Sequence, residues 1–201
     1  MAERAHPDDK SFQDRWFGLK KNPFRENLHR RYQHCVRFIE GKVVLDIPCG
    51  MGWGTSMLQG ARELHGVDIS EEAIREAKQR YGGIKFTVGN MTTFATAFPV
   101  AFFDLIVCLE GFEHITFLEG QAFLKNVQRA LKPGGLLILS TPLLYKDQYH
   151  SGNQYHLCEY KESELLRTLQ EHGLTIEEKS FLPTPQGNPV ALLTLGYSRA
   201  A

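Results

Sequence analysis

Hydrophobic positions along the chain fall into two alternating patterns. Short runs of Val, Ile, Leu and Phe are typical of strands that are buried on both faces of a parallel sheet. Between these runs, apolar residues recur at helical spacing among charged ones, as on helices that cover a sheet with one face. The predicted strands are 43–46, 63–68, 84–88, 103–109, 136–139, 174–181 and 190–197, and the predicted helices are 23–40, 55–60, 71–81, 117–131 and 161–172.

Strands and helices alternate along most of the chain, which predicts an α/β fold around a mostly parallel sheet. The link between the last two strands is short, so these strands are expected to pair antiparallel. We expect a single domain over residues 23–201, preceded by a polar segment at residues 1–22.

The first predicted strand ends at Asp46 and runs into a loop with three glycines, Gly50, Gly52 and Gly54. Glycine lets a backbone come very close to a ligand, because it has no Cβ and tolerates positive φ. The spacing departs from the dinucleotide fingerprint G-x-G-x-x-G, since Thr55 stands where the third glycine belongs. The loop therefore predicts a ligand site, and a turn without a ligand is the alternative.

Polar residues also end the second and third strands. Asp68 suits the two hydroxyls of a nucleotide ribose, because a carboxylate offers acceptor oxygens and no donor. Helix capping is its competing role, but Ser70 already serves as the N-cap. Ile69 is placed in the same ligand-binding set. Asn90 is expected to accept a hydrogen bond from an adenine amino group and Met91 to pack on the ring, with a turn and a core methionine as the alternative.

The fourth strand leads into three ionisable residues, Glu110, Glu113 and His114, where open parallel sheets carry their sites. A long loop follows the fifth strand and leads to His156. Imidazole titrates near neutrality without help, so His114, His156 and His29 are candidate bases, and we favour the first two. Glu113 is a candidate catalytic residue, with orientation of the loop as its alternative role.

Composition limits the possible partners and cellular location of the protein but does not identify an activity. The 201 residues include 23 basic and 23 acidic side chains, so no overall field favours nucleic acid or a membrane as partner. No apolar run is long enough to span a bilayer, and residues 1–10 lack the apolar core of a secretory signal. The cysteines show no C-x-x-C spacing, which indicates reduced thiols in a cytoplasmic protein.

The order Asp46, Gly50, Gly52, Gly54 resembles motif I of the class I S-adenosylmethionine-dependent methyltransferases. Further markers of this family are Val67-Asp68, Phe103-Asp104 with Glu113-His114, and Leu131-Lys132-Pro133-Gly134-Gly135. The resemblance covers roughly residues 24 to 198. It implies a Rossmann-like, doubly wound α/β sheet of seven strands, mostly parallel with an antiparallel last strand. It also implies S-adenosylmethionine as cofactor, S-adenosylhomocysteine as product, and a cofactor site that includes Asp46, Gly50, Gly52, Gly54, Asp68, Ile69, Asn90, Met91 and Glu110.

Three further segments carry a narrower likeness: Glu26-x-x-His29-x-Arg31-Tyr32, Ser140-Thr141-Pro142 and Asn153-Gln154-Tyr155-His156-x-x-Glu159-Tyr160. They resemble methyltransferases of types 11, 12 and 23, and among them bacterial members often encoded beside sugar and cell-envelope genes. Two residues depart from the pattern of these members: Gln154 replaces the usual proline, and Leu143 replaces the usual asparagine. The likeness implies O-methylation of a small-molecule hydroxyl, with a sugar or an anionic compound as acceptor.

Other functions stay open. Glu110, Glu113, His114 and His156 resemble the metal-binding set of small-RNA 2′-O-methyltransferases, in which a divalent ion would lower the pKa of the acceptor oxygen; we do not favour a metal. The segment 20–42 holds seven basic residues against two acidic ones, either as a solvated helix face or as a positive surface near an anionic acceptor or nucleic acid. A non-catalytic cofactor-binding subunit is a further alternative, whereas a nicotinamide dehydrogenase is disfavoured by the broken fingerprint.

Overall fold

The structure is a computed structural model that describes residues 23–145, 148–182 and 189–198. The predicted polar segment 1–22 lies outside these ranges. In chain order the described elements are α2 (Pro23–Val36), β1 (Val43–Asp46), η1 (Thr55–Met57), β2 (Glu63–Asp68), α3 (Glu71–Arg80), β3 (Lys85–Val88), η2 (Phe94–Ala97), β4 (Phe103–Leu109), η3 (Phe112–His114), α4 (Phe117–Ala130), β5 (Leu131–Pro142), α5 (Glu162–Glu171), β6 (Leu174–Leu182) and β7 (Val190–Tyr197).

The seven strands form one sheet in the order β3-β2-β1-β4-β5-β7-β6. The pairs from β3 through β5 are parallel, whereas β7 runs antiparallel to both β5 and β6. The predicted fold class is therefore confirmed, including the antiparallel last strand. The strand order reverses between β1 and β4, and in open α/β sheets ligands bind beyond the carboxyl ends of the strands at this point.

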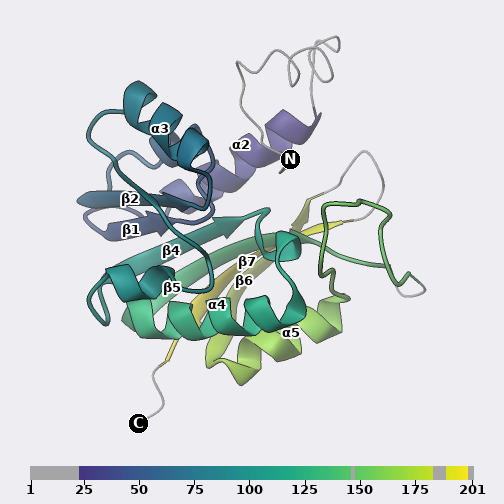
Figure 1. The fold of residues 1–201 in the computed structure, drawn as a ribbon. Helices are drawn as coiled ribbons and strands as arrows, with labels where there is room; N and C mark the ends of the chain where they lie inside the picture. Colours follow the sequence, from purple (N-terminus) through teal and green to yellow (C-terminus); the bar gives the residue numbers. More distant parts are fainter. Residues whose placement is uncertain (1–22, 146–147, 183–188, 199–201) are drawn as a thin grey trace.

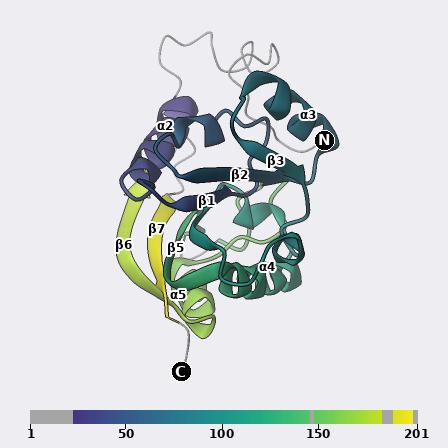
Figure 2. The same ribbon diagram turned by 90° about the vertical axis from the view of Figure 1, so that its left-hand side faces the viewer.

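Helices cover both faces of the sheet (Figure 1). α4 and α5 lie on one face, and α2 and α3 lie on the other, as the turned view in Figure 2 also shows. Successive strand residues point to opposite faces, so Leu45 and Ile106 join the core under α4 and α5, whereas Val44 and Leu105 join the core under α2. Burial on both sides explains why the strands are continuous apolar runs.

Three predicted elements differ in extent from the observed ones. The helix expected at 55–60 is only the 3-10 turn η1, because the chain between Gly54 and Glu63 is too short for a regular helical crossover. α2 ends at Val36 instead of continuing to residue 40, and hydrogen-bonded turns then carry Ile39 into the core. β5 begins at Leu131, and the predicted turn forms a bulge between the positions that pair with Phe103 and Leu105.

All strands in the described ranges lie in one sheet, which supports a single domain over residues 23–201; that boundary remains a proposal. No helix in the described part of the chain is both long and apolar enough to cross a lipid bilayer.

Candidate functional site

Asp46 ends β1 and is completely buried. Its Oδ2 accepts hydrogen bonds from the Thr55 hydroxyl at 2.6 Å and from the Tyr32 hydroxyl at 3.2 Å. Its Oδ1 has no partner among the described residues. Burial raises the pKa of Asp46 to about 7, although the two hydroxyl donors act in the opposite direction. A cation at this point would therefore stabilise the ionised carboxylate.

The glycine loop is tied to the end of β2 by one carboxylate. Gly50 N donates to Asp68 Oδ2 at 2.8 Å, and Ser70 N donates to Asp68 Oδ1 at 2.9 Å. Each carboxylate oxygen can accept more than one hydrogen bond, so Asp68 keeps acceptor capacity for the two hydroxyls of a ribose. Ser70 also caps α3 through its side chain, as predicted, and this leaves Asp68 available for a ligand.

The three glycines of the loop have different roles. Gly50 has a φ of +53°, and a Cβ there would meet no atom within 4 Å. A Cβ on Gly52 would lie 2.6 Å from the Phe86 ring, and one on Gly54 would overlap the Tyr32 ring. Gly52 and Gly54 therefore let the loop pack against the rest of the protein, and Gly50 is the position that borders open space beside Asp68.

Asn90 and Met91 lie where the alternative interpretation of the sequence put them, in a turn and in the core. Asn90 Oδ1 accepts hydrogen bonds from Thr92 N and from the Thr92 hydroxyl, both at 2.8 Å, so it closes a turn. Met91 is 9% exposed and belongs to the main core. Ile69, in contrast, is 67% exposed directly after Asp68, where an apolar ligand surface such as a purine ring would cover it.

Arg31 on α2 is a site residue to which the sequence analysis assigned no role. Its side chain is fully buried, and Nη2 lies 3.5 Å from Oε2 of Glu110. The other carboxylate oxygen of Glu110, Oε1, accepts a hydrogen bond from the Ser140 hydroxyl at 2.8 Å. Nε and Nη1 of Arg31 find no partner within the described ranges. Buried guanidinium donors are nearly always satisfied, so these two point to an anionic ligand. The only signal in the sequence was the position of Arg31 in the Glu26-x-x-His29-x-Arg31-Tyr32 segment.

Glu113, His114 and His156 come together in the structure. One potential ligand atom of each lies within 4.8 Å of those of the other two, although the histidines are far apart in the sequence. Glu113 is buried, and the Thr141 hydroxyl donates to its Oε2 at 3.0 Å. Burial and the nearby charge of Glu110 raise the pKa of Glu113 well above its usual range.

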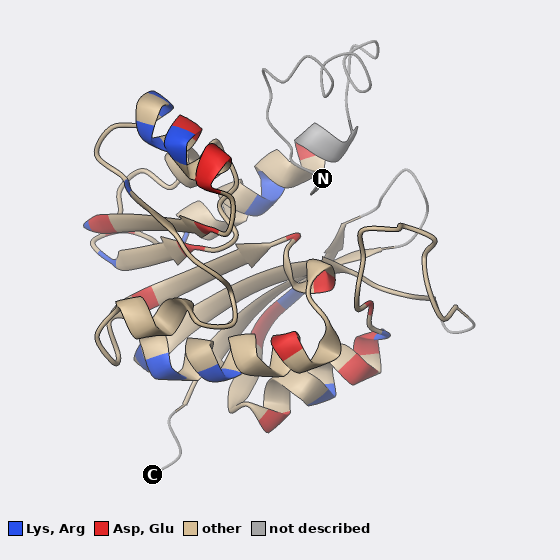
Figure 3. Ribbon diagram, viewed as in Figure 1, with Lys and Arg blue, Asp and Glu red and all other residues tan. Residues whose placement is uncertain are grey.

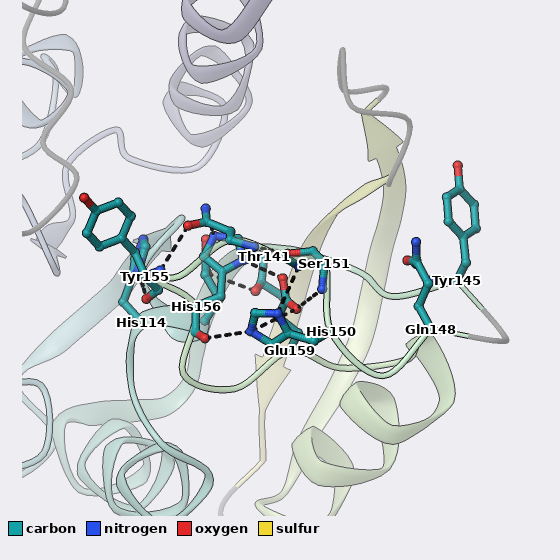
Figure 4. A network of polar contacts seen from close by, with 12 residues as sticks. His114, Thr141, Tyr145, Gln148, His150, Ser151, Tyr155, His156 and Glu159 are labelled. Carbon is teal, nitrogen blue, oxygen red and sulfur yellow. Dashed lines mark hydrogen bonds and ion pairs between the residues drawn. The ribbon is translucent and has the colours of Figure 1, made fainter.

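The two histidines differ in which ring nitrogens are occupied (Figure 4). His114 Nδ1 lies 2.9 Å from the carbonyl oxygen of Tyr155, so Nδ1 must carry the proton, and Nε2 is bonded to none of the described residues. His156 uses both nitrogens, Nδ1 with Glu159 at 2.5 Å and Nε2 with Asn153 Nδ2 at 2.9 Å. The geometry thus favours His114 over His156 as a base. His29, the third candidate, lies on the exposed face of α2.

The metal-binding set suggested by the resemblance is only partly assembled. Glu110 does not belong to the group formed by Glu113, His114 and His156, since its carboxylate contacts Ser140 and Arg31. The lone pair of His156 Nε2 is taken by the Asn153 amide. These contacts do not fit a four-residue metal centre, and metal use stays an open alternative.

Comparisons with known proteins find similarity to methyltransferases. A family model described as a methyltransferase domain matches residues 44–135. A probable S-adenosylmethionine-dependent methyltransferase of Mycolicibacterium smegmatis is 28% identical over 153 residues, 73% of this chain and 57% of that protein. A ubiquinone biosynthesis O-methyltransferase of Idiomarina loihiensis is 34% identical over 106 residues, 50% of this chain and 42% of that protein. The chain spans about half the length of the curated relatives it matches.

Among solved structures, the 1,6-didemethyltoxoflavin-N1-methyltransferase of Burkholderia thailandensis, with bound 1,6-didemethyltoxoflavin and S-adenosylhomocysteine, has the same fold. Its TM-score is 0.73 at 20% identity, over 99% of this chain and 93% of that one. The fold is that of a doubly wound α/β protein, with Asp46, Gly50 and Asp68 gathered at the carboxyl ends of β1 and β2. Residues 44–135 match a methyltransferase domain, and the relatives named above include S-adenosylmethionine-dependent methyltransferases, so the chain is similar to the class I family that its sequence resembles. The cofactor of this family is S-adenosylmethionine.

Proposed function

We propose that this protein transfers a methyl group from S-adenosylmethionine to a hydroxyl oxygen of a small-molecule acceptor. The observation that carries the proposal is a pair of buried, opposite charges with unsatisfied atoms, Asp46 Oδ1 and Arg31 Nε and Nη1. The amino-acid end of the cofactor is a zwitterion, so its ammonium complements Asp46 and its carboxylate complements Arg31. A guanidinium is suited to a carboxylate, because its donors match the two oxygens.

The rest of the cofactor site follows from the ends of β1 and β2. Asp68 would hold the ribose, with the Gly50 amide keeping the carboxylate in place. Ile69 would cover one face of the adenine. Asn90 Oδ1 already accepts two hydrogen bonds and Met91 lies in the core, so we assign these two residues to support of the turn after β3. Their contact with the adenine remains a prediction.

S-adenosylmethionine supplies an electrophilic methyl group on a sulfonium and leaves as the neutral thioether S-adenosylhomocysteine. The protein must hold the acceptor in line and remove the hydroxyl proton, whose pKa lies far above 7. We assign proton removal to His114 Nε2, with Glu113 beside it as a support. The new bond joins the acceptor oxygen to the methyl carbon, and the proton ends on the imidazole. The O-methyltransferase names of several relatives support an oxygen acceptor.

Calorimetric titration of S-adenosylhomocysteine into the wild-type protein and an Arg31→Met variant tests this function. We expect Arg31→Met to weaken binding by about 30-fold, since a hydrogen-bonded charge contributes on the order of 2 kcal/mol. Arg30→Met, on the exposed side of α2, is the matched control and should bind normally. Affinity for 5′-methylthioadenosine, which lacks the amino-acid end, should be the same in all three proteins. Failure of the wild-type protein to bind S-adenosylhomocysteine would refute the proposal.

A nucleic-acid acceptor has less support. In the basic segment, Arg31 is buried against Glu110, and Arg37 forms two hydrogen bonds with Glu178 at 2.9 and 3.0 Å. Figure 3 shows both signs of charge on α3 and on α4 instead of a face of one sign. Four free thiols support the proposed cytoplasmic location. The acceptor's identity, as a sugar or an anionic compound, remains a proposal of the narrower likeness.

A further inference from the structure

Glu159 lies in the loop between β5 and α5 and carries a nearly buried carboxylate, with its side chain 2% exposed. Its Oε2 accepts a hydrogen bond from Ser151 N at 2.6 Å, and its Oε1 accepts one from His156 Nδ1 at 2.5 Å. Burial alone would raise the pKa of Glu159, but the hydrogen bonds from Ser151 and His156 more than offset this and lower it. The loop therefore contains a buried anion that the reaction described above does not use.

Glu159 is the end of a continuous series of hydrogen bonds that begins at His114 (Figure 4). His114 Nδ1 donates to the Tyr155 carbonyl at 2.9 Å, and Tyr155 N donates to Asn153 Oδ1 at 3.0 Å. Asn153 Nδ2 donates to His156 Nε2 at 2.9 Å, and His156 Nδ1 donates to Glu159. Every donor in the series points toward the carboxylate.

The direction of the series is determined by the Glu159 carboxylate at one end and by the main-chain groups of Tyr155. A carboxylate offers only lone pairs, so His156 must carry its proton on Nδ1 and accept at Nε2. Asn153 must then direct its amino group toward His156 and its oxygen toward the Tyr155 amide, which can only donate. The Tyr155 carbonyl can only accept, so His114 carries its proton on Nδ1 and presents a bare Nε2.

A second set of contacts holds the segment 153–159, which contains the series, beside His114. Leu157 N and Cys158 N donate to the carbonyl oxygen of Glu113 at 2.8 and 3.2 Å. The rings of His114 and His156 stand edge to face with centroids 5.3 Å apart. The position of the Tyr155 carbonyl relative to His114 therefore depends on how this loop is held.

We propose that Glu159 is a positioning residue that, through His156 and Asn153, holds the Tyr155 carbonyl against His114 Nδ1, so that His114 keeps the Nδ1–H tautomer with Nε2 free for the acceptor. The value of this tautomer for methyl transfer rests on the proposed function, but the tautomer itself does not. Glu159 touches no reacting atom.

Glu159→Gln tests the proposal. A glutamine must turn its oxygen toward Ser151 N, which can only donate, so its amino group would face His156 Nδ1. That ring would then have to carry its proton on Nε2, opposite the Asn153 amino group, and the series would break. Glu162→Gln is the matched control, because Glu162 begins α5 and pairs only with the exposed Lys179 at 2.6 Å among the described side chains.

The readout is the ¹⁵N spectrum of histidine-labelled protein at about pH 8.5, two units above the ordinary histidine pKa, where imidazoles are neutral. We expect His114 in the Nδ1–H form in the wild-type protein and in Glu162→Gln, and loss of that form in Glu159→Gln. An Nε2–H form in the wild-type protein would overturn the proposal without any variant, as would an unchanged His114 signal in folded Glu159→Gln.

A second variant, Asn153→Ala, interrupts the series and leaves the buried carboxylate in place, so it should shift His114 in the same way even if Glu159→Gln does not fold. Binding of S-adenosylhomocysteine should be the same in every one of these proteins. Absence of that binding in the wild-type protein would count against the proposed function, whereas an Nε2–H form of His114 in the wild-type protein, or an unchanged His114 signal in folded Glu159→Gln, would count against the role of Glu159.

Discussion

The two sides of the site are built from contacts of very different range. On the cofactor side, formed by Asp46, Gly50 and Asp68, the hydrogen bonds join residues 9 and 18 positions apart. On the acceptor side, formed by Glu113, His114 and the loop at 148–160, the hydrogen bonds within the loop are local, but those of the Glu113 and His114 side chains join residues 28 and 41 positions apart. A short-range site is visible as a motif in one stretch of sequence, whereas a long-range site appears only when the chain has folded.

The largest expected effect lies on the cofactor side. Asp68→Ala should weaken binding of S-adenosylhomocysteine about 100-fold, because two hydrogen bonds to a charged acceptor are lost. Calorimetry measures this, with the exposed Glu71→Gln as control. The histidine spectrum of Asp68→Ala should be unchanged. A spectrum in which His114 moved as well would show that the two sides are not independent.

A pH series tests the role of the buried Asp46 carboxylate on the cofactor side. The pKa of Asp46 is raised to about 7, so below that pH a bound ammonium must displace a proton. Affinity for S-adenosylhomocysteine should fall about tenfold per pH unit below 7. Asp46→Asn should bind weakly at every pH without this slope, and a wild-type affinity independent of pH between 5 and 8 would contradict the role of Asp46.

The raised pKa of Asp46 also affects the stability of the protein in the absence of ligand. Between its ordinary pKa and about 7, Asp46 holds its proton in the folded protein and loses it in the unfolded chain. The unfolded state therefore binds fewer protons, and the contribution of Asp46 to the free energy of unfolding decreases as pH rises through this window. In Asp46→Asn that part of the pH dependence should be absent from urea unfolding.

Substitutions at the glycines of the loop should differ in their cost to the free energy of unfolding. Gly52→Val places side-chain atoms against the Phe86 ring and must also adopt a φ of +79°, so it should cost about 3 kcal/mol of unfolding free energy through overpacking and backbone strain together. Gly50→Ala meets no atom but must adopt a φ of +53°, at about 1 kcal/mol. Urea unfolding measures both. Equal losses would mean that the packing of Gly52 is looser than its contact with Phe86 indicates.

The smallest effect is expected from removal of metal on the acceptor side. Dialysis against a chelator should leave the histidine spectrum and the binding of S-adenosylhomocysteine unchanged, because the Asn153 amide occupies His156 Nε2. Addition of zinc should not displace the His156 signal. Displacement at stoichiometric zinc would instead support the metal-dependent alternative, with Glu113, His114 and His156 as ligands.

Much of the fold was predictable because its signals are local. The continuous apolar strands and the Ser70 cap were found where expected. The extent of η1 and β5 was not, because the length of a crossover and a bulge depend on the neighbouring strands. On the site, the motif located Asp46 and Asp68 but gave no role to Arg31, since a basic residue on an amphipathic helix has the same pattern whether it faces solvent or a ligand.

The sequence by itself determined the resemblance to the methyltransferases, the alternation of strands and helices, and the acid and glycines at the end of the first strand, because each of these depends on spacing along one segment. Only the tertiary structure decided which histidine has a free nitrogen, that Gly52 and Gly54 serve packing, and that Arg31 is buried with unsatisfied donors. The physical reason is that a hydrogen-bond partner or a contacting ring can come from anywhere in the chain. Its identity becomes known only when distant segments are brought to the same edge of the sheet.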